Sequence, residues 1–139
     1  MMQVFDITGP LPTGTTLLEA SAGTGKTWTI SALVTRYVAE GVASLDEMLV
    51  VTFTRAASQE LRERVREALT EARRALADPM SADAGNALIT WLLDTDDVER
   101  QRRLDRLTTA LADFDAATIA TIHQFCQMVL RSLGVAGDP

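Results

Sequence analysis

The most constraining feature of this sequence is a glycine-rich segment near its N-terminus that joins a predicted strand to a predicted helix. The segment reads Ala20-Ser21-Ala22-Gly23-Thr24-Gly25-Lys26-Thr27, after the β-rich run 15–20 and before apolar residues at helical spacing that end near Gly41. Glycines let backbone N–H groups approach phosphate oxygens, and the start of a helix adds unpaired N–H groups and a positive dipole end. The segment therefore predicts a phosphate-binding loop, in which Lys26 contacts the β- and γ-phosphates and Thr27 ligates Mg²⁺.

The rest of the chain alternates between predicted strands and predicted helices. The run 48–53 is apolar throughout, as expected for a buried parallel strand, and 117–121 is a further strand. The spacing of apolar residues predicts helices over 55–77, 86–93, 97–114 and 122–133. This alternation predicts an α/β fold, in which a parallel sheet built on the three runs is covered by helices.

The balance of charge argues against a protein that simply coats nucleic acid. The chain has 13 basic and 19 acidic residues and a net charge of −6, whereas such a protein would be basic. Net charge does not exclude DNA contacts at a few placed residues. On the predicted helix 55–77, arginines alternate with glutamates, and the pairs Glu60–Arg64 and Glu63–Arg66 are expected to form ion pairs on a solvated face.

Cysteine content and hydropathy exclude further kinds of site and of membrane attachment. The single cysteine, Cys126, excludes an internal disulfide, and no Cys/His cluster offers a metal site. We expect Phe125 and Cys126 to lie in the core. Because no apolar run is long enough to cross a bilayer and the N-terminus lacks the features of a signal peptide, we expect a cytoplasmic protein without a membrane partner.

Three motifs, in order along the chain, resemble those of the superfamily 1 DNA helicases of the UvrD/Rep type. The first is the loop 20–27, which begins with alanine where the general phosphate-loop pattern has glycine. The second is the segment 51–65, which opens Val51-Thr52-Phe53-Thr54-Arg55, and the third is Ala120-Thr121-Ile122-His123-Gln124-Phe125-Cys126. Within this superfamily the strings 19–27 and 121–127, together with Phe5-Asp6 and Pro10-Leu11-Pro12, are most similar to the RecB-type subunits.

The resemblance implies a RecA-like P-loop NTPase fold that uses ATP and Mg²⁺. Residues 1–139 would form the N-terminal part of a UvrD-like ATP-binding domain, an incomplete first motor domain, with 20–27 binding ATP and Lys26 catalytic. Phe53 would stack on a base of single-stranded DNA, a contact worth roughly 1–3 kcal/mol. Thr54, Arg55, Thr121 and His123 would line the path of the same strand.

The resemblance also implies what the longer protein does. It would be an ATP-dependent DNA helicase and exonuclease of double-strand-break repair and recombination, acting on single-stranded DNA and duplex ends with RecC- and RecD-like subunits. The family's Asp-Glu strand, second motor domain and nuclease domain would lie beyond Pro139. Asp94 is a poor substitute for that strand, because it precedes the third motif, whereas in the family the Asp-Glu strand follows that motif. The segment 94–97 also fits a helix end followed by a helix cap.

The isolated chain is expected to be inactive and poorly stable, since an unfinished sheet leaves an apolar edge uncovered. Alternatives remain open. The chain could belong to an AddA- or UvrD-like helicase, to a small P-loop kinase that phosphorylates a metabolite without DNA, or to a non-catalytic nucleotide-binding domain that binds a partner through its helical middle. The last alternative would be indifferent to the loss of Lys26.

Overall fold

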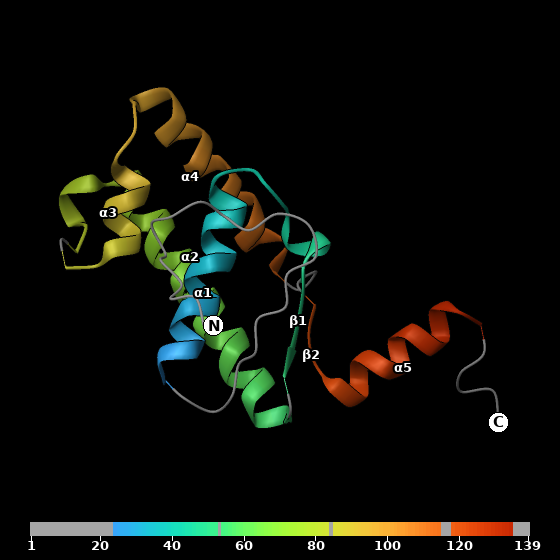
Figure 1. Cartoon of the computed structure of the whole chain (residues 1–139). Coiled ribbons are helices and arrows are strands. Elements are labelled where there is room, and N and C mark those ends of the chain that lie inside the picture. Colours follow the sequence, from blue (N-terminus) through green and yellow to red (C-terminus); the bar gives the residue numbers. More distant parts are fainter. Residues whose placement is uncertain (1–23, 53, 84, 115–117, 135–139) are drawn as a thin grey trace, which may run out of the picture.

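The computed structural model describes residues 24–52, 54–83, 85–114 and 118–134. In chain order the elements are α1 (Thr24–Ala39), the 3₁₀ turn η1 (Leu45–Glu47), β1 (Leu49–Thr52), α2 (Arg55–Ala77), the 3₁₀ turn η2 (Pro79–Ser81), α3 (Ala87–Leu93), α4 (Asp97–Ala112), β2 (Thr118–Thr121) and α5 (Ile122–Ser132). Figure 1 shows α1 to α4 gathered in one body, with β1 and β2 along one side of it and α5 extending away.

The prediction of an α/β fold dominated by a parallel sheet is wrong for the described part of the chain, which is mostly helical. There, the sheet is limited to β1 and β2, two parallel strands of four residues each. The physical reason lies in the long segment between them. Its helices bury their apolar faces against α1 and against one another, so the core is built between helices. The expected strand at 15–20 lies outside the described residues.

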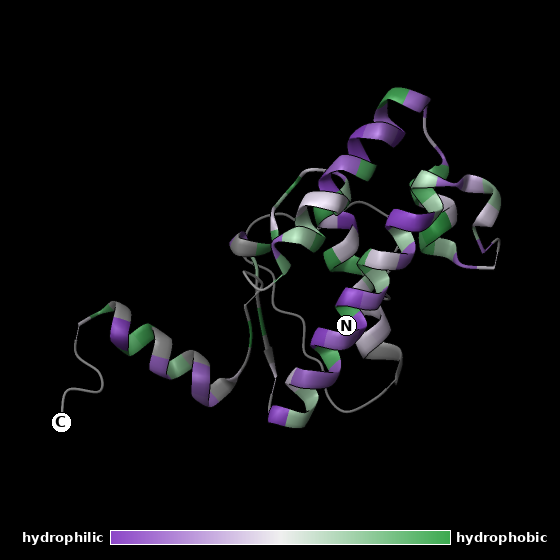
Figure 2. Cartoon of the chain, turned by 180° about the vertical axis from the view of Figure 1, so that it is seen from behind, coloured by the Kyte–Doolittle hydropathy of each residue, from purple (hydrophilic) through white to green (hydrophobic). Residues whose placement is uncertain are grey.

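The core joins four helices and one face of the small sheet. Its members include apolar residues that the helical spacing predicted for α1 and α2, among them Leu33 and Leu69, and also Leu92 of α3. Leu69, at the middle of α2, is fully buried. Figure 2 shows hydrophobic and hydrophilic segments alternating along α2, as expected for a helix that buries one face. The helical body therefore has the continuous apolar interior that a stable domain needs.

One arginine lies inside this body. Arg36 on α1 is 2% exposed and forms an ion pair with Glu40 one turn later. Its guanidinium also lies 4.7 Å from the centre of the Trp91 ring on α3. A buried charge is tolerated only when it is paired in this way, so Arg36 ties α1 to α3. Burial raises the pKa of the neighbouring Tyr37 above its ordinary value, and the charge on Arg36 opposes this rise.

The arginines of α4 hold the C-terminal ends of the other three helices of the body. Arg100 donates to the Leu76 carbonyl of α2, Arg103 to the Leu92 carbonyl of α3, and Arg106 to the Ala39 carbonyl of α1, each at 2.9 Å. The last carbonyls of a helix lack partners within it and carry the negative end of its dipole, so a guanidinium is a favourable partner there. We call Arg100, Arg103 and Arg106 the α4 arginines.

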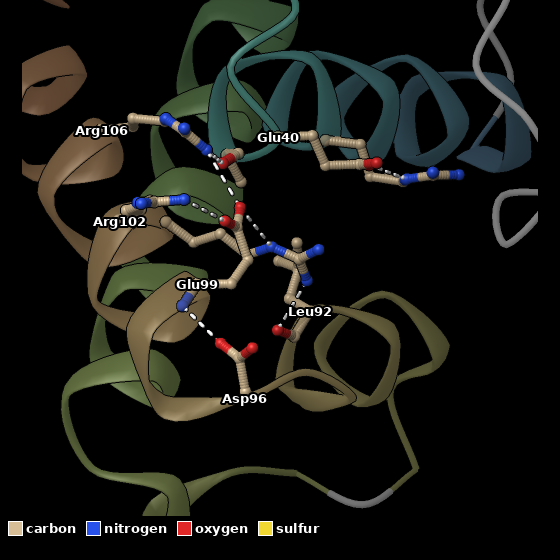
Figure 3. Close-up of polar contacts among 9 residues, drawn as sticks. Glu40, Leu92, Asp96, Glu99, Arg102 and Arg106 are labelled. Atoms are coloured by element: carbon tan, nitrogen blue, oxygen red, sulfur yellow. Dashed lines mark hydrogen bonds and ion pairs between the residues drawn. The ribbon is translucent and has the colours of Figure 1, made fainter.

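Glu99 orients two of the α4 arginines from the first turn of the same helix (Figure 3). Its carboxylate lies 3.6 Å from Arg103 and 3.2 Å from Arg106, and 3.7 Å from Arg102. Its own backbone N–H donates to the Asp96 carboxylate at 2.8 Å, which caps the helix. The expectation that 94–97 ends one helix and caps the next is confirmed, because Asp94 follows α3 and Asp96 precedes α4.

The ion pairs expected on α2 are not the ones that form. Arg64 pairs with Glu67 at 3.2 Å and not with Glu60. Arg66 lies over the ring of Phe114, 5.6 Å from its centre, and has no carboxylate within ion-pair distance in the described chain. The prediction of a self-paired helix face is therefore wrong for Arg66. Phe114, which is buried at the end of α4, offers this side chain a neutral partner from outside the helix.

Candidate nucleotide- and nucleic-acid-binding site

The two strands end at the same edge of the sheet. Their pairing is parallel, with Thr52 beside Thr121 as the last pair. After this pair, α5 begins at Ile122, and α2 begins at Arg55. The N-termini of two helices therefore lie at the edge where two parallel strands finish. We call this edge, with the segments 52–55 and 121–124, the strand-end edge.

Threonine side chains cap both helices at the strand-end edge. The Thr54 hydroxyl accepts a hydrogen bond from the Ala57 N–H at 3.0 Å, and the Thr121 hydroxyl accepts one from the Gln124 N–H at 3.1 Å. The Gln124 side chain accepts in return from the Thr121 N–H at 2.9 Å, which completes a capping box. In each cap the threonine oxygen is the acceptor, so its O–H proton is left for another acceptor.

A second pair of hydroxyl groups fixes the turn from β1 into α2. The buried Thr52 hydroxyl is hydrogen-bonded to the buried Ser58 hydroxyl, and it lies 3.1 Å from the Thr54 carbonyl oxygen. If Thr52 donates to that carbonyl, Ser58 donates to Thr52. This contact was missed at the level of sequence. The signal for it was Ser58, a polar residue at a position where the apolar stripe of the helix 55–77 faces the core.

The structure brings together four of the residues expected to contact DNA. Thr54 and Arg55 lie at the start of α2, and Thr121 and His123 at the start of α5. Arg55 and His123 are exposed, whereas Thr121 is buried at 7% exposure. His123 is thus available to a ligand and is not a buried histidine. Phe53, the expected stacking residue, lies outside the described residues.

Helix α1 begins inside the predicted phosphate loop. Thr24, Gly25 and Lys26 form its first turn, while 20–23 lie outside the described residues. The first N–H groups of a helix have no carbonyl partner within it, and they carry the positive dipole end that phosphate binding uses. Figures 1 and 2 both show α1 beginning at the same end of the molecule as the strand-end edge, the lower end in each view.

Thr27 is the loop residue whose side-chain surroundings the structure describes. It is half-buried, and its carbonyl accepts a hydrogen bond from the Ser31 hydroxyl at 2.8 Å. With the exposed Trp28 and with Asn86 and Ile89, it lines a cavity of about 280 Å³ between α1, α2 and α3. The residue expected to hold Mg²⁺ therefore borders this cavity.

Other expectations are limited or corrected by the described residues. Cys126 is exposed, so its predicted place in the core is wrong, and the side chain of Phe125 is not described.

Within the described ranges, no three His, Cys, Asp or Glu side chains gather as a metal site. Among the described helices, none combines the length and the hydropathy of a membrane-spanning segment. Asp94 follows the end of α3 and is exposed, as expected for a helix terminus.

Comparison with known proteins adds an independent finding. Residues 6–138 match the family model of the UvrD/REP helicase N-terminal domain. The chain is 63% identical over 139 residues to the RecBCD enzyme subunit RecB of Mycolicibacterium smegmatis, a match that covers 99% of this chain. It is 58% identical over 139 residues to the same subunit of Mycobacterium tuberculosis.

The similarity extends to relatives of lower identity. The RecB subunit of Escherichia coli is 41% identical over 126 residues, which covers 85% of this chain and 10% of that protein. The match to the Mycolicibacterium smegmatis subunit covers 12% of its length. The chain thus spans about an eighth of the length of the Mycolicibacterium smegmatis and Mycobacterium tuberculosis subunits.

Proposed function

This chain belongs to the UvrD/REP helicase family, and from that premise we propose that it is the ATP- and DNA-binding N-terminal part of a longer, RecB-like helicase subunit. The proposal assigns nucleotide binding to the start of α1 and single-stranded DNA to the strand-end edge. It is supported by the helix N-termini that the fold brings to one end of the molecule. The Asp-Glu strand, the second motor domain and a nuclease domain are then expected in the sequence that follows residue 139.

For nucleotide binding, we assign the loop 20–27 to the phosphates of ATP. Lys26 would contact the β- and γ-phosphates, and the Thr27 hydroxyl would ligate Mg²⁺. Support comes from the start of α1 within the loop, because the N-terminal N–H groups of a helix are the donors that phosphate oxygens accept from. When bound, Mg²⁺ neutralises charge on the transferred phosphoryl group, while the chain positions that group.

For DNA binding, we assign Phe53 to base stacking, and Thr54, Arg55, Thr121 and His123 to the backbone of the same strand. The parallel register supports this assignment, because it places Thr121 next to the segment that leads into Phe53. Stacking on an aromatic ring tolerates any base, so the contact would serve translocation without sequence preference. Exposed Arg55 offers a guanidinium to a phosphate oxygen.

At the level of the longer protein, the printed names of the relatives guide the proposal. They are subunits of a RecBCD enzyme, so we expect RecC- and RecD-like partners, a role in double-strand-break repair and recombination, and exonuclease activity from a downstream domain. Cytoplasmic location follows from this role, since the DNA substrate lies there.

The observation that carries the proposal is the match of 6–138 to a helicase domain, together with the start of α1 inside the phosphate loop. The test is DNA-stimulated ATP hydrolysis by the full-length protein carrying Lys26→Ala. We expect a loss of about 100-fold or more, because the lysine stabilises charge that develops in the transition state. Arg74→Ala, an exposed change in the last turn of α2, is the matched control and should leave hydrolysis unchanged.

Two results would contradict the proposal. One is full DNA-stimulated hydrolysis in the Lys26→Ala protein while its thermal unfolding is unchanged. The other is phosphoryl transfer to a small-molecule acceptor that is independent of DNA, which would indicate a kinase.

A further inference from the structure

Helix α2 carries a straight row of arginines along one face. Arg55, Arg62, Arg66 and Arg73 are seven, four and seven residues apart. At 3.6 residues per turn they fall within about 20° of a common line, and the row is about 27 Å long. We call these four residues the α2 arginine row. The glutamates of the same helix, Glu60, Glu63, Glu67 and Glu71, lie about 80° to 160° away around its axis.

Three of the four charges of this row are held in place by neutral partners and are not neutralised. Arg62 and Arg66 lie over the Phe114 ring, 6.0 and 5.6 Å from its centre, and Arg73 donates to the Thr108 hydroxyl at 2.9 Å. Both partners are neutral. None of the four arginines has a carboxylate within 4.0 Å in the part of the chain that the structure describes, whereas Arg64 on the other side of α2 pairs with Glu67. A row of oriented, unpaired positive charge on a protein of net charge −6 calls for an anionic partner.

We infer that the α2 arginine row binds the phosphodiester backbone of DNA and extends the path of the strand beyond the strand-end edge. This inference rests on the proposed function, since the row begins at Arg55, which belongs to that edge. At 3.4 Å per nucleotide of a stacked strand, the row could accompany roughly eight nucleotides.

The surroundings favour DNA over an acidic protein. Protein interfaces are centred on buried aromatic and aliphatic anchors. The large exposed hydrophobic side chains among the described residues are Trp28, Val42, Met80, Val98, Val129, Leu130 and Leu133, and none of them lies on α2. Phosphate binding needs no such anchor, because it depends on charge and on the release of counterions.

The test compares two double variants of the full-length protein that change net charge equally. Arg62→Gln with Arg66→Gln removes the middle of the row, whereas Arg64→Gln with Arg74→Gln removes two arginines outside it. Affinity for an oligonucleotide of arbitrary sequence is measured at several salt concentrations, once with single-stranded DNA and once with duplex DNA. Each lost phosphate contact lowers the slope of log affinity against log salt by about 0.7 for single strands and about 0.9 for duplex.

We expect the Arg62/Arg66 variant to reduce the slope by about 1.4 on single strands, or by about 1.8 if the row follows a duplex, and the Arg64/Arg74 variant to leave it unchanged. A third variant, Arg62→Lys with Arg66→Lys, keeps the charge and should keep the slope. It also separates loss of binding from loss of folding.

Three results would overturn the inference. The slope and the assembly with partner subunits could both stay unchanged in the Arg62/Arg66 variant, or the slope could fall equally in both double variants, which would indicate a long-range effect of net charge. The Arg62/Arg66 variant could instead keep its slope but fail to assemble with its partner subunits, which would assign the row to an acidic protein. If the wild-type protein binds no DNA at all, the proposed function fails first, and this outcome is distinct from the other three.

Discussion

Helices α4 and α2 both carry spaced arginines, but the two sets have different partners. The α4 arginines donate to carbonyl oxygens at the ends of α1, α2 and α3, and Glu99 pairs with two of them. The α2 arginine row meets an aromatic ring and a hydroxyl group, and no carboxylate among the described residues. The comparison teaches that residue type alone does not assign a role. An arginine that donates to a helix-end carbonyl supports the fold, whereas an arginine whose described partners are only neutral side chains keeps its charge available to a ligand.

The first prediction concerns what holds α2 in place. If its arginine row is free for DNA, the helix must be fixed by its buried face. Leu69→Ala should then lower the free energy of unfolding by about 2–5 kcal/mol, because it removes a fully buried side chain and leaves a cavity. Denaturant unfolding measures this. Leu133→Ala, at a side chain that is 69% exposed, should cost less than about 0.5 kcal/mol. Equal costs for the two variants would contradict the packing described for α2.

The second prediction compares one arginine from each set. Arg103→Met should lower the free energy of unfolding by about 1.5–3 kcal/mol, because it removes a charged donor from the Leu92 carbonyl. The Arg103 side chain is only 12% exposed. Arg66→Met should cost less than about 1 kcal/mol, since an exposed cation–π contact is worth about 0.5–1 kcal/mol. Chemical unfolding of both proteins gives the comparison directly. A larger cost at Arg66 than at Arg103 would break it.

The third prediction uses two glycines with nearly the same backbone φ angle. Gly41 and Gly134 have φ values of 75° and 74°. A Cβ at Gly41 would lie 2.8 Å from Cζ of Arg106, whereas one at Gly134 would meet nothing within 4 Å. Both Ala variants carry the left-handed strain of about 1–2 kcal/mol. Gly41→Ala should cost more, because Arg106 must move away from the Ala39 carbonyl. Equal shifts in the unfolding midpoint would show that Arg106 contributes little there.

The fourth prediction concerns the threonine cap of α5 at the strand-end edge. Thr121→Ala removes the cap of α5 and should cost about 1 kcal/mol, whereas Thr121→Ser keeps the hydroxyl and should cost less. Thermal unfolding checks the order of the two variants. If the Ala variant unfolds like the wild type, the capping box seen at Thr121 does not contribute to stability.

Much of the local structure could be predicted from the sequence, because its signals are local. Helix α2 has the predicted bounds, since Thr54 caps its start and Pro79 follows its end. The interpretation of 94–97 as a helix end and a cap is likewise confirmed. The family resemblance is confirmed as well, since it depends on ordered motifs and not on how the chain packs.

The features that the sequence did not predict depend on contacts between residues that are far apart along the chain. Glu63 is a local partner for Arg66 by spacing, but Phe114, far along the chain, provides the partner that forms. The acceptors of the α4 arginines are backbone carbonyls, which no side-chain pattern reveals. The α/β prediction failed because alternation along the chain counts strands and helices without showing which of them build the core. The candidate site residues at 20–23 and at Phe53 stay predictions.

The division between a helical body that supports the fold and an end that binds ligands is tested most directly by hydrogen–deuterium exchange of the full-length protein. Backbone exchange is compared with and without a magnesium-bound, non-hydrolysable ATP analogue. We predict slower exchange over 20–30, where nucleotide would cover the start of α1, and unchanged exchange over α3 and α4. Unchanged exchange over 20–30, or protection confined to 87–112, would contradict it.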